Sequence, residues 1–285
     1  MTVVSTSVYP TPDRDFFEAP TSPRRTDPLA TVHASAPTQR GRLAAEGSGD
    51  EGRSTDPLSS SIAIMLFEDV EMTTADGTMN AHVARPGGTG SWPGVIVYMP
   101  ASGIRSELIG IAARIASLGY VTVLPNLYYR LASEVDIDAN RLFDPDYAPV
   151  RDYMIGLSQN LTNERVIADT ATLLDFLDAR TDVKPGPKGG VGYCMGGRLV
   201  MAGIGAHPDR MTAAASMYGA GVVTDRPDSP HRCLHRVTGE LYFGLADNDV
   251  YVDDAETEAL RAHLATLWGP NIASCLVRLR FGTRV

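Results

Sequence analysis

The sequence predicts an α/β protein with a mostly parallel sheet flanked by helices, and three observations support this prediction. Short apolar runs typical of buried strands alternate with longer segments in which apolar residues recur at helical spacing. A strand, helix, strand succession at this spacing forms a right-handed parallel crossover, so helices must cover the sheet. The chain of 285 residues is long enough for one large domain of this class.

Charge and cysteine content exclude several functional classes. The formal net charge of −9 argues against a general nucleic-acid binder. The three cysteines are sparse and show no C-x-x-C spacing, which argues against a disulfide framework, a zinc ribbon and a dithiol redox centre. No apolar run reaches the length of a membrane span, and the amino terminus lacks the apolar core of a secretory signal. We therefore expect a cytoplasmic protein that uses no nucleic acid, membrane, metal or cofactor, with an oligomeric state that the sequence does not predict.

Residues 1–60 are predicted to be a disordered tail that precedes a folded domain at 61–285. Prolines interrupt every candidate element of the tail, and the segment has too few apolar residues to offset the entropy of ordering it. A transit peptide is the alternative, and Asp13, Asp15 and Glu18 argue against it. The ordered pattern begins at Met65, which raises the hypothesis that the natural chain starts there.

The first half of the domain begins with a predicted hairpin, whose strands at 67–73 and 79–84 flank a turn at 75–77. The continuous apolar run at 94–99 predicts a buried strand. A helix follows with Leu108 and Leu118 on its apolar face and ends at Gly119, before a strand at 120–124. Residues 126–160 are expected to form a long polar loop that serves as a lid or substrate wall, with surface decoration as the alternative.

The second half continues the alternation. A helix begins near Thr162, a capping residue, and leads to a strand before Cys194. Beyond the helix that follows Cys194, strands are predicted at 212–219 and 240–246, separated by a loop at 221–238. A helix at 254–268 and a last strand at 274–281 complete the domain.

The segment Gly-Gly-Val-Gly-Tyr-Cys-Met-Gly-Gly-Arg-Leu-Val at 189–200 is predicted to be a nucleophile elbow, a sharp turn from strand to helix with Cys194 at its tip. Gly192 and Gly196 allow the strand and the helix to approach closely. A helix amino terminus is expected to favour the Cys194 thiolate and to bind an oxyanion. A buried structural cysteine in a glycine-rich turn is the alternative.

Three segments together resemble the dienelactone hydrolase family of α/β-hydrolases over roughly residues 66–281. They are Gly-Tyr-Cys-Met-Gly-Gly at 192–197, the run from Gly119 through Pro-Asn-Leu-Tyr-Tyr-Arg at 125–130, and Gly-Leu-Ala-Asp-Asn-Asp-Val-Tyr-Val at 244–252. The resemblance implies an α/β-hydrolase fold and hydrolysis of a small-molecule lactone or carboxylic ester through a Cys-His-Asp triad.

The resemblance also implies roles for individual residues. Cys194 matches the nucleophile, and Asp249 matches the acid, preferred over Asp247 because it keeps the spacing Asp-x-x-Val. Both aspartates can alternatively be turn residues that cap the next helix. The expected oxyanion donors are the backbone N–H groups of Met195 and Ala101.

Substrate-binding residues are expected in the segment after the strand at 120–124. Tyr128 and Arg130 are the candidates there, and Arg141 and Arg151 are further candidates for holding a substrate carboxylate. Each arginine can alternatively be a solvated surface residue.

Two departures from the family put catalysis in doubt. Pro100 stands where the family commonly has an acidic residue near the thiol. The general base is normally a histidine after the last strand, whereas this sequence has no histidine after His263, which is interpreted as an exposed helical residue. Loss of the histidine by truncation or frameshift stays open. The histidines and cysteine at 231–235 are too few for a metal site.

Three functional hypotheses are consistent with the sequence. The favoured one is a dienelactone hydrolase-like enzyme with impaired turnover, because water must be deprotonated to hydrolyse the acyl-enzyme and a general base contributes about 10²–10⁴-fold. The second is a catalytically dead member that binds a small molecule or a protein. The third is a hydrolase of another acyl substrate, such as a thioester or peptide.

Overall fold

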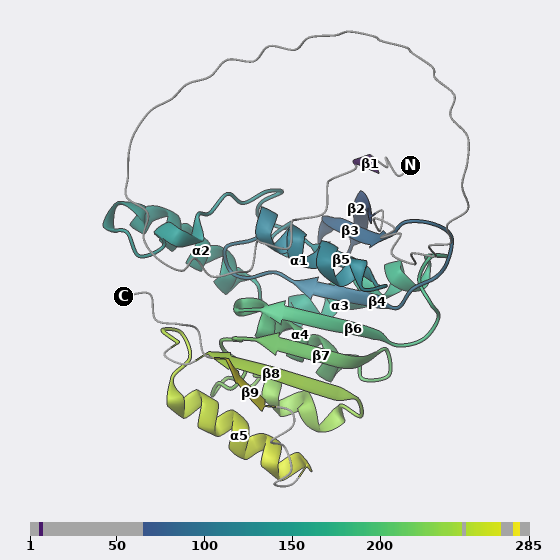
Figure 1. Cartoon of the computed structure of the whole chain (residues 1–285). Helices are drawn as coiled ribbons and strands as arrows, with labels where there is room; N and C mark the ends of the chain where they lie inside the picture. The colour runs from purple at the N-terminus through teal and green to yellow at the C-terminus, as the bar shows by residue number, and fades with distance from the viewer. Residues whose placement is uncertain (1–5, 8–64, 247–248, 269–275, 280–285) are drawn as a thin grey trace, which may run out of the picture. The chain divides into compact units, whose positions relative to one another are not determined.

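One sheet of nine strands, in the order β1-β2-β3-β5-β4-β6-β7-β8-β9, runs through the described part of the chain (Figure 1). The structure is a computed structural model and describes residues 6–7, 65–246, 249–268 and 276–279. The predicted disordered tail lies outside the described residues except for β1 (Thr6–Ser7), which pairs antiparallel with β2 (Met65–Thr74).

The amino-terminal part of the sheet is antiparallel. β2 and β3 (Gly77–Pro86) form the predicted hairpin, in which Thr74 pairs with Gly77 at the turn. β3 then pairs antiparallel with β5 (Val121–Pro125). The hairpin therefore extends one edge of the sheet that carries the site.

The rest of the sheet is parallel. β4 (Gly94–Tyr98) pairs with β5 on one side and with β6 (Lys188–Tyr193) on the other. β7 (Met211–Met217), β8 (Glu240–Ala246) and β9 (Leu276–Leu279) follow in parallel register. The predicted mostly parallel α/β fold is confirmed. The carboxyl ends of β4, β6, β7 and β8 meet at one edge of the sheet, where open α/β sheets bind ligands.

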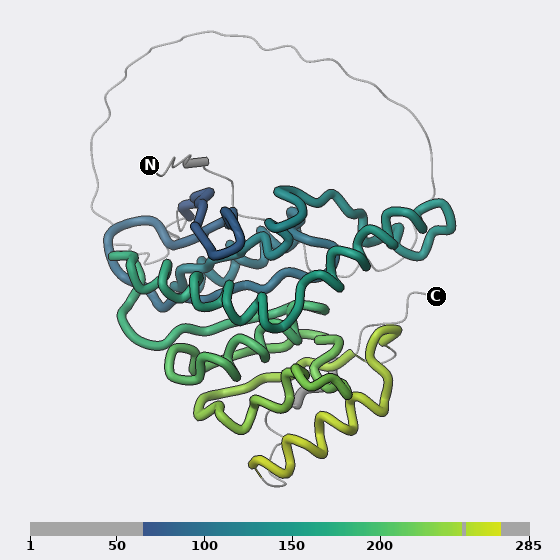
Figure 2. Tube along the Cα trace, turned by 180° about the vertical axis from the view of Figure 1, so that it is seen from behind, coloured from purple at the N-terminus to yellow at the C-terminus, as the bar shows by residue number. Residues whose placement is uncertain are grey.

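Helices cover the sheet on both faces. α1 (Ser106–Ser117) joins β4 to β5 and packs on β3 and β5. The other face carries α3 (Asn163–Asp178), α4 (Met195–Ala206) and α5 (Asp254–Trp268) (Figure 2). The crossovers that contain these helices run along the sheet in the direction opposite to the β4-α1-β5 crossover, and because all the connections are right-handed, the helices lie on the face opposite α1. Thr162 caps α3 as predicted, because its side chain accepts a hydrogen bond from the Arg165 N–H at 3.3 Å.

Two sequence-based expectations about elements are wrong. Residues 126–160 are not one loop, because they contain the short 3₁₀ turns η2 (Ala139–Arg141) and η3 (Pro145–Tyr147) and the helix α2 (Ala148–Asn160). α2 buries only Met154 and Leu157, so it lacks the apolar periodicity that marks a helix in sequence. Leu118 does not face the core, because α1 ends at Ser117 and Leu118 is 78% exposed.

The predicted loop at 221–238 contains a further 3₁₀ segment, η4 (Pro230–Arg236), which packs against α4 and α5. In the described residues every helix is too short or too polar to cross a bilayer. The buried core lies between the sheet and these helices, and Tyr98 and Phe243 are among its largest side chains. The Tyr98 hydroxyl lies 2.9 Å from the Thr170 hydroxyl, so this buried polar group is paired.

Candidate active site

Cys194 lies at the tip of the predicted elbow, between the end of β6 and the start of α4. Its backbone has φ 53° and ψ −118°, a conformation that residues other than glycine rarely adopt. Strain of this kind costs about 1–3 kcal/mol and is concentrated at functional sites. The surrounding backbone holds the turn, because the Cys194 N–H donates to Met217 O at 3.0 Å and the Cys194 carbonyl accepts from the Gly197 N–H at 2.9 Å.

The glycines on either side of Cys194 are required by close backbone approach, as predicted. A Cβ at Gly192 would collide with the carbonyl of Gly196. A Cβ at Gly196 would collide with the carbonyl of Tyr98, at the end of β4. The strand, the elbow helix and the neighbouring strand can therefore meet only if both positions lack side chains.

The thiol lies among groups that act on it in opposite directions. Burial raises the pKa of the half-buried Cys194, and the negative charge of Asp249 raises it as well. Hydrogen bonds from the backbone N–H groups of Met195 and Ala101 lower it but do not outweigh the other effects. The expectation that the elbow favours the thiolate is wrong in net direction, because desolvation penalises the charged form more than the amides stabilise it.

The structure brings together the four residues for which the resemblance implied catalytic or oxyanion roles. Met195 begins α4, Ala101 lies on the loop after β4, and Asp249 lies on the loop after β8. Asp249 Oδ1 also accepts the Tyr251 N–H at 2.8 Å, the contact expected of a turn residue. Asp247 lies outside the described residues, so the choice of Asp249 stays a prediction.

No histidine in the described ranges is hydrogen-bonded to Asp249. The segment after β9, where the resemblance places the general base, lies outside those ranges. His263 is not the exposed helical residue that was expected. It is half-buried on α5, its ring packs edge-on against His231 at 4.9 Å between centroids, and its Nε2 is buried without a hydrogen-bond partner.

Comparisons with known proteins agree with this geometry. The family model for the dienelactone hydrolase family matches residues 79–268. The chain belongs to the dienelactone hydrolase family.

Individual relatives of this family support the assignment. A carboxymethylenebutenolidase homologue from Synechocystis sp. is 29% identical over 182 residues, which cover 61% of this chain and 70% of the relative. Carboxymethylenebutenolidase 1 of Cupriavidus pinatubonensis is 26% identical over 200 residues, which cover 70% of this chain and 79% of the relative. The crystal structure of a dienelactone hydrolase homologue from Klebsiella pneumoniae has a TM-score of 0.61 at 20% identity, covers 76% of this chain and 85% of that chain, and shows the same fold.

In this dienelactone hydrolase family member, Tyr128 lies beside the thiol. It is 2% exposed, its hydroxyl donates to the Ala101 carbonyl at 2.9 Å, and its oxygen lies 3.7 Å from Met195 Sδ. Burial raises the pKa of Tyr128, so the phenol stays protonated and acts as a donor. The hydroxyl is already engaged with the protein, and direct substrate contact by Tyr128 stays a prediction.

Arg130 does not have the free guanidinium that substrate binding requires. Its Nη1 and Nη2 each donate to the Asp169 carboxylate at 2.8 Å, and its Nε donates to Asp76 Oδ2 at 2.7 Å. The Asp169 side chain is 1% exposed and that of Arg130 is 10% exposed. The expected substrate-binding role of Arg130 is therefore corrected to a structural one, because a buried cation and a buried anion must remain paired.

The other two arginine candidates are also engaged. Arg141 pairs with Asp144 at 3.2 Å and with Asp146 at 2.6 Å on the surface. Arg151 Nη1 donates to the Leu142 carbonyl at 3.0 Å.

Sequence reasoning missed Tyr218, which lies near the thiol, and Arg105, whose charge acts on Tyr218. Burial raises the pKa of Tyr218 to about 12, the Cys194 charge acts in the same direction, and the charge of Arg105 lowers it. Arg105 Nε is buried without a hydrogen-bond partner, and Nη1 lies 3.7 Å from Glu107. A guanidinium of this kind can bind an anionic group. The only sequence signal was the position of Arg105 just before a predicted helix.

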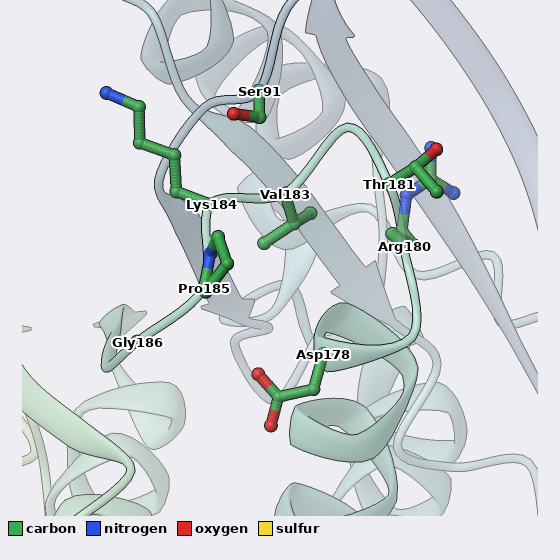
Figure 3. A pocket seen from close by; sticks show the side chains of 8 residues that line it. All are labelled: Ser91, Asp178, Arg180, Thr181, Val183, Lys184, Pro185 and Gly186. Atoms are coloured by element: carbon green, nitrogen blue, oxygen red, sulfur yellow. The ribbon is translucent and has the colours of Figure 1, made fainter.

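A cavity of about 480 Å³ lies at the opposite edge of the sheet (Figure 3). Its lining comes from Ser91 and from residues 178–186, which precede β4 and β6, so it includes none of the predicted site residues. Among the described residues no group of three or more His, Cys, Asp or Glu side chains is arranged to hold a metal ion.

Proposed function

We propose that this protein hydrolyses a small-molecule lactone or carboxylic ester through the thiolate of Cys194. The observation that supports this proposal most directly is the pair of backbone N–H groups, from Met195 and Ala101, that face the sulfur. Amide donors at this position can bind the oxygen of an acyl carbonyl as it becomes negatively charged. Removal of one such donor typically costs about 10²–10³-fold in kcat.

The proposed reaction has two steps. In the first, Cys194 Sγ forms a bond to the acyl carbon, the carbon–oxygen bond of the ester or lactone breaks, and the leaving oxygen takes up a proton. In the second, water adds to the thioester, the carbon–sulfur bond breaks, and the released acid and the thiol recover their protons. The carboxylate of Asp249 lies near enough to act on the charge of the thiol, and it would orient a base.

Turnover by this chain is proposed to be slow. The raised pKa of Cys194 keeps the thiol mostly protonated near neutral pH, which limits the first step. In the described ranges no histidine is hydrogen-bonded to Asp249, which leaves the water of the second step without an identified base. We expect acylation of Cys194 to exceed deacylation.

Rapid-mixing kinetics with p-nitrophenyl acetate would test this proposal. We expect a burst approaching one p-nitrophenol per chain, followed by a slow steady phase, and mass spectrometry should find the acetyl group on the peptide that carries Cys194. Cys194→Ala should abolish the burst, whereas Cys233→Ala, which removes a free thiol outside the site, should preserve it. Fast steady turnover would contradict the slow-turnover proposal, and a burst retained in Cys194→Ala would contradict the nucleophile.

The same features favour a second candidate function, a catalytically inactive member that binds a small molecule or protein. A thiol with a raised pKa and no identified base suits a binding site as well as a slow enzyme. Retained affinity for a lactone without any acyl group on Cys194 would distinguish this function from the first.

A further inference from the structure

We infer that Tyr128 is a positioning residue, whose hydroxyl sets the orientation of the Ala101 backbone amide that faces the Cys194 sulfur. This inference rests on the proposed function for its catalytic meaning. Its structural basis is independent, because it concerns the environment of the thiol before any substrate binds.

The two backbone amides that face the sulfur belong to separate parts of the chain. Ala101 lies on the loop after β4, and Met195 is the first residue of α4. Tyr128, from the segment after β5, reaches both. Its hydroxyl donates to the Ala101 carbonyl at 2.9 Å and contacts Met195 Sδ at 3.7 Å. A phenol has one proton to donate, and a carbonyl oxygen is a stronger acceptor than a thioether, so Ala101 receives the hydrogen bond.

Fixing the Ala101 carbonyl also restricts the Ala101 amide. The Ala101 N–H lies in the peptide plane of the Pro100 carbonyl, and the Ala101 carbonyl lies in the next plane. Hydrogen bonds to both carbonyls therefore limit rotation about the Ala101 Cα, which joins the two planes. Pro100 has no N–H to donate, and the turn is closed by the Gly103 N–H bond to the Pro100 carbonyl at 3.0 Å.

Tyr128 is itself held in place. Its backbone N–H donates to Asn126 Oδ1 at 3.0 Å, and Asn126 is only 5% exposed. Asn126 Nδ2 donates in turn to the carbonyls of Ala132 and Ser133 at 2.9 Å and 3.0 Å. A buried phenol on a fixed backbone can act as a rigid support for the loop after β4 that carries Ala101.

The test uses the full chain and measures the pKa of the Cys194 thiol from the pH dependence of its alkylation by iodoacetamide, followed on the Cys194 peptide by mass spectrometry. Tyr128→Phe removes the hydroxyl and keeps the ring. The Ala101 amide should then stabilise the thiolate less, and the thiol pKa should rise by about 0.5 to 1 pH unit, less than full loss of a charge-assisted hydrogen bond would give. The burst rate with p-nitrophenyl acetate should fall about tenfold, below the effect of deleting a donor.

Tyr129→Phe is the matched control. It removes a phenol hydroxyl from the next residue. That hydroxyl is hydrogen-bonded to Thr74 and Asp169 at 2.7 Å and 2.9 Å rather than to the loop that carries Ala101. The midpoint temperature of thermal unfolding can change in either variant, but the pKa of the Cys194 thiol should shift only in Tyr128→Phe. An equal shift in both variants would assign the effect to general destabilisation and overturn the inference.

Asn126→Ala provides a second variant if Tyr128→Phe does not fold. It removes the acceptor for the Tyr128 N–H, so the thiol pKa should rise in the same direction by a smaller amount. An unchanged thiol pKa in the folded variants overturns the inference. Failure of the proposed function would look different, since a wild-type chain without any burst could still show the rise of the thiol pKa in Tyr128→Phe.

Discussion

At the residue scale, Cys194 is subject to three effects of known direction. Burial raises the pKa of its thiol, Asp249 raises it further, and two amides lower it. A group whose pKa is raised in the folded state contributes stability below its ordinary pKa, and this contribution is lost as the pH rises through the folded value. The proton on Cys194 therefore stabilises the fold near neutral pH, while the proposed reaction requires its removal.

Removal of the Asp249 charge should make the thiol more acidic. We expect Asp249→Asn to bring the pKa of Cys194 down towards its ordinary value near about 8.5, because a repelling negative charge is lost. Iodoacetamide alkylation of Cys194 would then begin at lower pH than in the wild type. Asp253→Asn is the control on the same loop, since that carboxylate caps α5 by accepting the Glu256 N–H at 2.7 Å. An alkylation profile that does not move in Asp249→Asn would contradict the expected closeness of the two groups.

The residue scale also shows why chemical type alone is a poor guide to role. Arg130 and Arg105 are both arginines near the carboxyl edge of the sheet. Arg130 is fully engaged by Asp169 and Asp76, whereas Arg105 keeps a buried Nε without a partner. The difference lies in the partners that the fold supplies and not in the side chain.

At the scale of elements, the elbow depends on the contact between the start of α4 and the end of β4. Gly196 faces the Tyr98 carbonyl with no space for a methyl group. α4 could move away from β4 only by displacing Met195, whose amide faces the sulfur. The close packing of helix and strand and the position of the proposed oxyanion donor are therefore one structural feature.

Replacement of this glycine should be costly, in contrast to a glycine in an open helical position. Gly196→Ala is expected to lower the free energy of unfolding by about 1–3 kcal/mol or more, as overpacking does. Gly110→Ala, in α1, should raise it by about 0.4–1 kcal/mol, because an added Cβ there meets nothing within 4 Å and alanine favours the helix. Urea denaturation of both variants provides the comparison. Equal effects would show that the contact at Gly196 can relax.

At the scale of the whole molecule, ion pairs that are mostly half-buried join parts of the chain that are distant in sequence. Arg130 connects the β2-β3 turn, through Asp76, with α3, through Asp169. Glu68 of β2 accepts hydrogen bonds from Arg85 of β3 and from Arg180 in the loop after α3. These pairs hold the antiparallel hairpin against the parallel part of the sheet.

Breaking the pair at Asp169 should therefore destabilise the whole fold. Asp169→Asn leaves the buried Arg130 cation without its main partner, and we expect a loss of about 3–5 kcal/mol in the free energy of unfolding. Asp175→Asn, on the same helix, removes an exposed carboxylate that pairs with Arg210 at 2.8 Å and should cost less than about 1 kcal/mol. Thermal and urea unfolding measure both changes. Similar losses in the two variants would contradict the structural role assigned to Asp169.

The sequence by itself determined the parallel sheet, most of its strands and helices, the elbow at Cys194 and the glycines around it. These features depend on local patterns, namely apolar periodicity, capping residues and the steric requirement of a tight turn. α2 was missed because it buries only two residues and so leaves little periodic signal.

Only the tertiary structure decided the direction of the thiol pKa, the pairing of Arg130 with Asp169, and the link from Tyr128 to Ala101 and Met195. Each of these depends on burial or on a partner contributed by a distant segment, and Asp169, for example, is 39 residues from Arg130. Desolvation and hydrogen-bond partners are properties of assembled surroundings, so a pattern along the chain can name a candidate reactive residue but cannot show how its neighbours set its charge.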